Sequence, residues 1–208
     1  MLPNYEMLAN GVIRQISRKK YQYGYEYSAN YNNLGELGKR MAHLRLGFLL
    51  GTLNFTPKRL LDVGYGNGDF LLTAKDIIPF CFGNDVSSSY PVPAGTTWVE
   101  DIYRDEYDVV CFFDVLEHFE SIYDISKIST QYIIVSAPEC HYFSDEWFEN
   151  WKHRKPDEHL WHFNKQSLTN FFCELGYKPI AYSNIEDLIR KPVHDYSNIF
   201  TMIFKKFN

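Results

Sequence analysis

Short apolar runs alternate with amphipathic segments along almost the whole chain after Pro57. Strands that are buried on both faces have this composition, because crossover helices cover both sides of a parallel sheet. The alternation therefore predicts an α/β fold, a doubly wound Rossmann-like sandwich. The expected strands are residues 59–64, 79–83, 97–101, 107–113, 132–136, 178–182 and 199–204, and the expected helices are residues 34–48, 69–77 and 164–175.

The first 56 residues differ in composition from the rest of the chain. Tyrosines nearly alternate in residues 21–31, a spacing compatible with a strand, but glycine and asparagine interrupt it. Apolar residues then recur at steps of three and four from Leu34 to Phe48, which is the spacing of a helix with one buried face. We expect residues 1–56 to form a tyrosine-rich, partly helical extension that packs on a domain of residues 57–208.

Composition limits the class of protein. The chain has 208 residues and a formal net charge of −5. This length suits one domain, and the negative charge gives no general attraction for a nucleic-acid backbone. The four cysteines fall singly, which indicates reduced thiols rather than a disulfide framework or a zinc site. No stretch resembles a signal peptide or a membrane span, so we expect a cytoplasmic protein with no membrane partner.

The most informative segment contains three alternating glycines, Gly64, Gly66 and Gly68, where a predicted strand passes into a helix. Glycine lets the backbone turn sharply and lets a ligand approach its amides. The spacing is shorter than the one that accommodates a pyrophosphate, and Asp62 before the turn would repel phosphate but can hold an ammonium group. Asp85 ends the next predicted strand, where a carboxylate can accept both hydroxyls of a ribose. These features favour a nucleoside ligand without phosphate.

Asp101 follows the third predicted strand, where an adenine amino group needs an acceptor. With this residue, and with the motif of residues 113–118 after the fourth strand, the chain resembles class I S-adenosylmethionine-dependent methyltransferases from about Arg59 onward. The resemblance implies the strand order 3-2-1-4-5-7-6 with the last strand antiparallel, S-adenosylmethionine as cofactor and S-adenosylhomocysteine as product. The cofactor residues that it implies are Asp62, Gly64, Tyr65, Gly66, Gly68, Asp85, Val86, Asp101, Ile102, Phe113 and Asp114. Tyr65 departs from the many relatives that have a small residue there, and this changes the packing expected near the methionine moiety.

Residues 138–163 contain four of the seven histidines and three of the four tryptophans. This segment is too long for a minimal connection, so we expect it to form a lid on the acceptor side of the cofactor. Around His159 it resembles the histidine-containing stretch of type 11 and type 23 methyltransferases, which makes His159 the first candidate for a catalytic base. His118 is the second candidate, since imidazole titrates near neutral pH. For both histidines a purely structural role, in packing or capping, stays open.

A metal site is an alternative that we do not favour. Asp114, Glu117 and His118 are similar to the Glu-x-x-Glu-His element of ubiquinone-type O-methyltransferases and small-RNA 2′-O-methyltransferases, which coordinate a divalent cation. Three ligands at this spacing can converge where a strand passes into a helix, and a cation there would acidify a hydroxyl acceptor. The shorter Asp114 in the first position weighs against this arrangement. We therefore predict no metal ligands.

The preferred function is a methyltransferase for a small polar, aromatic or sugar-like acceptor, with transfer to oxygen, nitrogen or carbon. One alternative is a nucleic-acid methyltransferase, which the acidic charge balance disfavours. Another is a non-catalytic partner subunit that keeps the cofactor pocket as a scaffold. We expect a monomer or a homodimer.

Overall fold

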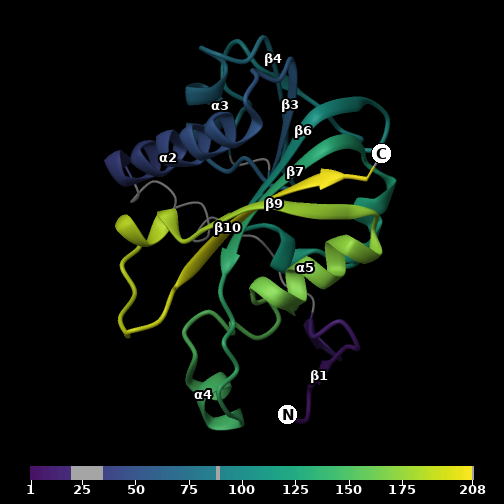
Figure 1. Ribbon diagram of the computed structural model, residues 1–208, viewed down its shortest axis with the longest axis vertical. Coiled ribbons are helices and arrows are strands. Elements are labelled where there is room, and N and C mark those ends of the chain that lie inside the picture. The colour runs from purple at the N-terminus through teal and green to yellow at the C-terminus, as the bar shows by residue number, and fades with distance from the viewer. Residues whose placement is uncertain (20–34, 88–89, 208) are drawn as a thin grey trace.

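Residues 1–19, 35–87 and 90–207 are described by the computed structural model, with a seven-stranded sheet at its centre (Figure 1). In spatial order the strands are β5 (Thr97–Trp98), β4 (Phe80–Asn84), β3 (Arg59–Val63), β6 (Glu106–Phe113), β7 (Ser129–Pro138), β10 (Ile199–Lys206) and β9 (Tyr177–Ser183). The first five are parallel, and β10 is antiparallel to both of its neighbours. When the seven strands of this sheet alone are numbered 1 to 7 along the chain, their spatial order is 3-2-1-4-5-7-6. The predicted fold class and strand order are therefore confirmed.

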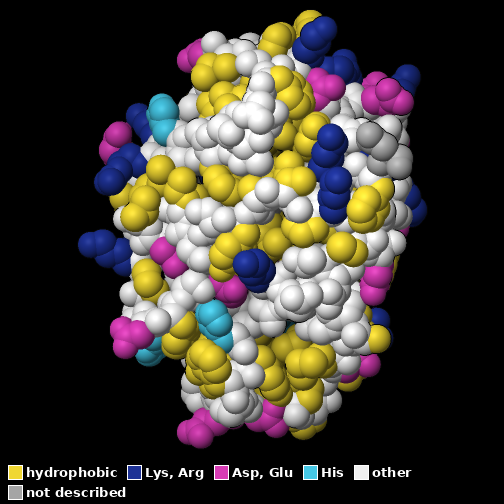
Figure 2. Space-filling model, in the orientation of Figure 1, with side chains coloured by type: hydrophobic (Ala, Val, Ile, Leu, Met, Phe, Trp, Pro, Cys, Tyr) yellow, Lys and Arg dark blue, Asp and Glu magenta, His cyan; other side chains and the backbone are white. Residues whose placement is uncertain are grey.

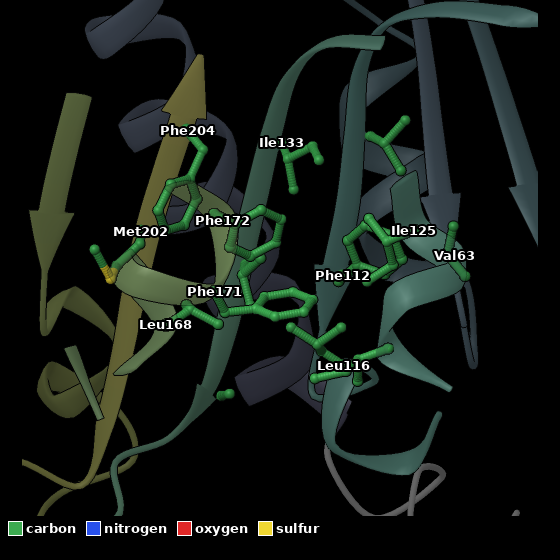
Figure 3. Packing of buried hydrophobic residues seen from close by; sticks show 14 of the residues in the cluster. Val63, Phe112, Leu116, Ile125, Ile133, Leu168, Phe171, Phe172, Met202 and Phe204 are labelled. Carbon is green, nitrogen blue, oxygen red and sulfur yellow. The ribbon is translucent and has the colours of Figure 1, made fainter. Parts of the chain in front are cut away.

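One face of the sheet is covered by helix α5 (Lys165–Glu174) and by two short 3-10 helices, η1 (Leu116–His118) and η2 (Ile122–Lys127). Aromatic side chains dominate this half of the core. The rings of Phe172 and Phe204 stack with centroids 4.3 Å apart (Figure 3). Burial of such a side chain contributes about 1.5–3 kcal/mol, so this packing fixes α5 on the sheet.

Helices α2 (Gly35–Leu53) and α3 (Asp69–Ala74) cover the opposite face. Helix α2 continues past Phe48, where the predicted helix ended, because Leu49 and Leu53 are buried in the core. This packing outweighs the low helix propensity of Gly51. Helix α3 is shorter than predicted and ends at Ala74.

Helix α5 begins and ends where the sequence predicted. The Asn164 side chain accepts a hydrogen bond from the Ser167 backbone N–H at 2.8 Å, and the Ser167 hydroxyl accepts one from the Asn164 N–H at 2.9 Å. This reciprocal pair is a capping box. Beyond the helix, Gly176 adopts a φ of 84°, which stops the helix and leads into β9.

A second, three-stranded sheet consists of β1 (Tyr5–Met7), β2 (Ile13–Gln15) and β8 (Trp161–His162). It was not predicted, and the alternating tyrosines of residues 21–31 lie outside the described residues. In this sheet β2 pairs with β8, so the N-terminal segment is attached to the predicted lid.

The predicted lid, residues 138–163, leaves the carboxyl end of β7 and forms helix α4 (Asp145–Asn150) at the lower end of the molecule in Figure 1. Tyr5 packs on it, with its ring 5.0 Å from the ring of Phe148. The division of the chain at residue 57 and the function of the lid stay predictions. None of the helices in the described part of the chain is long and apolar enough to cross a membrane.

Candidate functional site

The turn between β3 and α3 contains three glycines with positive φ angles: Gly64 at 71°, Gly66 at 55° and Gly68 at 81°. Residues with a Cβ atom rarely adopt these angles. The turn is also crowded, because a Cβ on Gly64 would lie 2.4 Å from Cγ2 of Val115 and one on Gly68 would lie 2.3 Å from Cγ of Pro93. The glycines therefore form the turn and also let two neighbouring segments approach its backbone closely.

Asp85, directly after β4, faces this turn. Its Oδ2 accepts a hydrogen bond from the Gly66 N–H at 2.9 Å, and its Oδ1 accepts one from the Ser87 N–H at 2.7 Å. A carboxylate has about four acceptor positions, so Asp85 can accept further donors. The next residue, Val86, is 85% exposed and lies at the surface beside the turn. The predicted ribose role of Asp85 is compatible with this position.

Asp101 and Ile102 follow β5 at the same edge of the sheet. Asn84 at the end of β4 connects to this segment by donating from Nδ2 to the Val99 carbonyl at 2.9 Å. The exposed Asp101 accepts a hydrogen bond from the Tyr103 N–H at 2.9 Å. Ile102 is only 7% exposed and belongs to the core. A ligand can thus reach Asp101, whereas Ile102 mainly contributes to packing.

A cavity of about 80 Å³ lies between the glycine turn, the end of β6 and α2. It is lined by Gly38, Met41, Ala42, Arg45, Asp62, Gly64, Tyr65, Asn67, Asp69, Phe70, Phe113 and Asp114. Five of the predicted cofactor residues are therefore brought together. Tyr65 is one of them, and it is fixed by the hydrogen bond that its hydroxyl donates to the Tyr90 carbonyl at 2.7 Å.

Asp62 is the most unusual residue of this cavity. It is 2% exposed, and its Oδ1 has no hydrogen-bond partner among the described residues. Burial raises the pKa of Asp62 to about 8, while the charge of Arg45 lowers it and the charge of Asp85 raises it. An unpaired buried carboxyl is costly. A cationic group in the cavity would supply the missing partner.

A group of four charged residues borders this cavity; Asp114 was predicted as a cofactor residue, whereas Arg45, Glu186 and Arg190 were missed by the sequence analysis. Arg45 donates from Nε to Glu186 at 2.7 Å and from Nη2 to Asp114 at 3.0 Å. Arg190 donates from Nη1 to Asp114 at 2.8 Å and to Glu186 at 3.1 Å. Burial alone would raise the pKa of Asp114, but the charges of Arg190 and Arg45 outweigh it and hold the pKa far below its usual range. The carboxylate of Asp114 is therefore ionised and doubly paired.

One signal in the sequence could have located this group. Arg45 lies four residues after Met41 and four before Leu49, on the buried face of α2. A lone arginine on an apolar helix face needs a buried acidic partner. The partners, Asp114 and Glu186, lie 69 and 141 positions further along the chain, so the sequence alone does not identify them.

A second cluster lies just beyond the end of β6. Glu117, His118 and His159 each offer a ligand atom, and these atoms lie within 4.8 Å of one another. Glu117 is 2% exposed, and neither of its carboxyl oxygens has a hydrogen-bond partner in the described part of the chain. Nδ1 of His118 lies 3.1 Å from the Glu158 carbonyl, and Nδ1 of His159 lies 2.7 Å from the His153 carbonyl. A carbonyl only accepts, so each Nδ1 is the donor and each neutral ring has its lone pair on Nε2.

The cluster changes the interpretation of the predicted catalytic residues. Burial, and after it the charge of His118, lower the pKa of His159 to about 2. Burial also lowers the pKa of His118. Burial therefore favours the neutral form of both rings, and a lowered pKa makes an imidazole a weaker proton acceptor. The roles of His159 and His118 as bases stay predictions.

The predicted metal element is only partly assembled. Glu117 and His118 come together, but the Asp114 carboxylate is bound by two arginines instead. His159, which lies 41 positions after His118, completes the cluster in its place. Two neutral imidazoles and one carboxyl group are common ligands for a divalent cation.

Comparison with known proteins shows the family and the fold of the chain. A family model described as a methyltransferase domain matches residues 34–182, whereas no curated protein matches the chain. One similar structure is a methyltransferase in complex with the Haloferax volcanii Trm112 activator, at a TM-score of 0.63 and 12% identity, covering 88% of this chain and 97% of that one.

Two further similar structures were solved with S-adenosylhomocysteine. One is the Burkholderia thailandensis 1,6-didemethyltoxoflavin-N1-methyltransferase, at a TM-score of 0.57 and 12% identity, covering 99% and 100% of the two chains. The other is the magnesium protoporphyrin IX methyltransferase of Synechocystis, at a TM-score of 0.54 and 13% identity, covering 91% and 90%. At these identities the structures show a shared fold.

The family match includes the glycine turn, the acid after β4 and the charged end of β6. The strand order and the cavity beside Asp62 agree with it. The chain therefore belongs to the methyltransferase domain family and is an S-adenosylmethionine-dependent methyltransferase.

Proposed function

We propose that this methyltransferase acts on a hydroxyl oxygen of a small polar acceptor. The observation that carries the proposal is the convergence of Glu117, His118 and His159 beside the end of β6. S-adenosylmethionine supplies an electrophilic methyl group when bound, so the protein has to align the acceptor and remove its proton. The similar structures named for 1,6-didemethyltoxoflavin and magnesium protoporphyrin IX support a small acceptor, and the net charge of −5 disfavours nucleic acid.

The cavity residues fit the amino-acid end of the cofactor. The unpaired Oδ1 of Asp62 suits an ammonium group. Arg45 is held by Glu186 and Asp114 through Nε and Nη2, which leaves Nη1 to bind a carboxylate. Asp85 accepts the ribose hydroxyls, and Asp101 accepts the adenine amino group.

Two candidates explain how the hydroxyl loses its proton. In the first, the Glu117 carboxylate accepts it while the two neutral histidines position the oxygen. In the second, Glu117, His118 and His159 hold a divalent cation, which lowers the pKa of the hydroxyl. The second is favoured by the two hydrogen bonds from Nδ1 to backbone carbonyls, because metal-binding histidines are oriented by such bonds.

Glu117→Gln tests both candidates. The substitution keeps the shape of the side chain but removes the group that accepts a proton or binds a cation. We expect turnover to fall by about 10²–10⁴-fold, while affinity for S-adenosylhomocysteine stays within about twofold because Glu117 does not line the cofactor cavity. Transfer of a labelled methyl group to hydroxyl-bearing small molecules measures turnover, and calorimetry measures the affinity for S-adenosylhomocysteine.

The control is Glu120→Gln, because Glu120 lies at the surface and, among the residues that the structure describes, pairs only with Arg18. It should leave both quantities unchanged. Removal of divalent cations with a chelator separates the two candidates, because only the cation-dependent one loses turnover. Full turnover of Glu117→Gln would contradict the proposed role of the cluster, and label in oligonucleotides rather than small molecules would contradict the acceptor class.

A further inference from the structure

A second, larger cavity lies between α4 and the segment that leads into β10. Its volume is about 630 Å³, which is in the range of small-molecule sites. It is lined by Ser144, Glu146, Trp147, Asn150, Trp151, Lys152, Pro192, Val193, His194, Tyr196, Ser197 and Asn198. We call it the α4 trough. Figure 2 shows hydrophobic and histidine side chains in the lower half of the molecule, where α4 lies at the bottom and this segment at the left above it (Figure 1).

The walls of the α4 trough are aromatic and fixed. The indole rings of Trp147 and Trp151 stack with centroids 5.4 Å apart and an interplanar angle of 22°. Trp147 also donates from Nε1 to the Tyr196 hydroxyl at 2.9 Å, which links α4 to the opposite wall. Tyr196 in turn stacks on His194 at 5.1 Å. Rings held in this way present flat apolar surface at little entropic cost.

Polar groups are interspersed with these rings. Lys152 and Glu146 are exposed, and neither side chain has a hydrogen bond or an ion pair with another described residue. Asn150 and Asn198 add amide groups to the lining. A sugar ring needs this combination, because its C–H face is apolar and its hydroxyls both donate and accept hydrogen bonds. A flat aromatic ligand would use the rings but would form few hydrogen bonds with the polar groups.

Two hydrogen-bond paths start at Asn198 in the α4 trough, one leading to the catalytic cluster and one to the four-charge group beside the cofactor cavity. In the first, His153 donates from Nε2 to Oδ1 of Asn198 at 2.9 Å, and the His153 carbonyl holds His159. In the second, Asn198 donates from Nδ2 to the Arg190 carbonyl at 2.9 Å, and Arg190 pairs with Asp114. The trough therefore lies on the side of the site where the acceptor is expected.

We propose that the α4 trough binds a pyranose or furanose ring of the acceptor, remote from the hydroxyl that is methylated. This inference rests on the proposed function, because it takes the histidine cluster as the place of transfer. Binding of a remote sugar ring gives orientation that the reacting hydroxyl alone cannot supply. The acceptor is accordingly a glycoside or a larger saccharide rather than a single small ring.

Ligand-observed NMR and tryptophan fluorescence test the proposal without turnover. The probes are the methyl glycosides of the common hexoses, pentoses and 6-deoxyhexoses, with 4-hydroxybenzoate as the aromatic comparison. We expect at least one glycoside to bind, with saturation transferred to its C–H face. Trp147→Ala should weaken that binding by about tenfold or more, and Trp147→Phe should restore part of it.

Two variants keep the test independent of folding. Lys152→Ala changes an exposed residue of the trough and should weaken glycoside binding, whereas Trp98→Ala changes a tryptophan on β5, at the opposite side of the sheet, and should not. All variants should bind S-adenosylhomocysteine normally. The inference is overturned if no glycoside binds, if 4-hydroxybenzoate binds in the trough instead, or if neither trough variant changes glycoside binding.

These outcomes are separate from failure of the proposed function. If labelled methyl transfer depends on Glu117 but glycosides do not bind, only the trough assignment fails. If glycosides bind in the trough but Glu117→Gln transfers the methyl group as the wild type does, the transfer site is wrong and the inference falls with it.

Discussion

Gly64→Ala is expected to abolish binding of S-adenosylhomocysteine. The added Cβ would lie 2.4 Å from Cγ2 of Val115, on a residue with a φ of 71°. A left-handed backbone conformation costs a non-glycine residue about 1–3 kcal/mol, and the turn or Val115 must also move to relieve the contact. The displaced turn no longer places its amides and Asp62 around the cofactor cavity. We expect an affinity loss of at least about 100-fold in a calorimetric titration.

The matched control is Gly47→Ala in α2. A Cβ on Gly47 meets nothing within 4 Å, so the substitution introduces no contact. It should raise the free energy of unfolding by about 0.5–1 kcal/mol, because alanine favours the helix over glycine, and it should leave the affinity unchanged. Wild-type affinity in Gly64→Ala would contradict the assignment of the glycine turn to the cofactor site. Loss of affinity in both variants would show that the loss in Gly64→Ala is not specific to this turn.

Arg45→Met is expected to lower the free energy of unfolding by about 3–5 kcal/mol, because it removes the bidentate partner of a buried carboxylate and leaves the single Nη1 contact of Arg190 in its place. Glu186 is fully buried, and Arg45 is its bidentate partner. Burial is the largest effect and would raise the pKa of Glu186, but the charge and hydrogen bonds of Arg45, with the charge of Arg190, together outweigh it, so the pKa is lowered in the folded protein. A carboxyl group whose pKa is lowered in the folded state stabilises the fold at pH values above its pKa in the unfolded chain, which is about 4. This contribution is lost as the pH falls toward the pKa of the folded state. The deficit of the variant should therefore be largest near neutral pH and shrink in acid.

Chemical denaturation of the variant and of Arg40→Met measures this effect. Arg40 lies on the exposed face of α2, and its replacement should change stability by less than about 0.5 kcal/mol. Addition of Glu186→Gln to Arg45→Met should recover part of the loss, because the buried charge is then gone. Equal stability of Arg45→Met and Arg40→Met would contradict the role assigned to the four-charge group.

The parallel sheet was predictable from the sequence, because its apolar runs are typical of strands buried on both faces, whereas the strand order was predicted from the resemblance to class I methyltransferases. The ends of α5 were predictable too, since Asn164 and Gly176 have clear local roles. The glycine turn was equally visible, because Gly64 and Gly68 serve a backbone conformation that other residues rarely adopt.

What could not be predicted depends on contacts between distant parts of the chain. Strands β1 and β2 have three residues each, too few to show a period, and they form by pairing with each other while β2 also pairs with the distant β8. The comparison of Asp114 with a metal-binding element did not anticipate that Arg45 and Arg190 both pair with its carboxylate. In the same way, His159 joins Glu117 through the path of the lid rather than through sequence spacing.

A calorimetric titration with S-adenosylhomocysteine, in buffers of different ionisation enthalpy, tests the central claim that Asp62 and the glycine turn hold the cofactor. The raised pKa of Asp62, about 8, means that the free carboxyl is mostly protonated at neutral pH. Pairing with an ammonium group requires it to ionise, so binding should release a proton, and affinity should rise as the pH increases toward about 8. In Asp62→Asn the proton release should vanish and binding should weaken. Binding without proton release that Asp62→Asn leaves unchanged, or no binding at all, would contradict the claim.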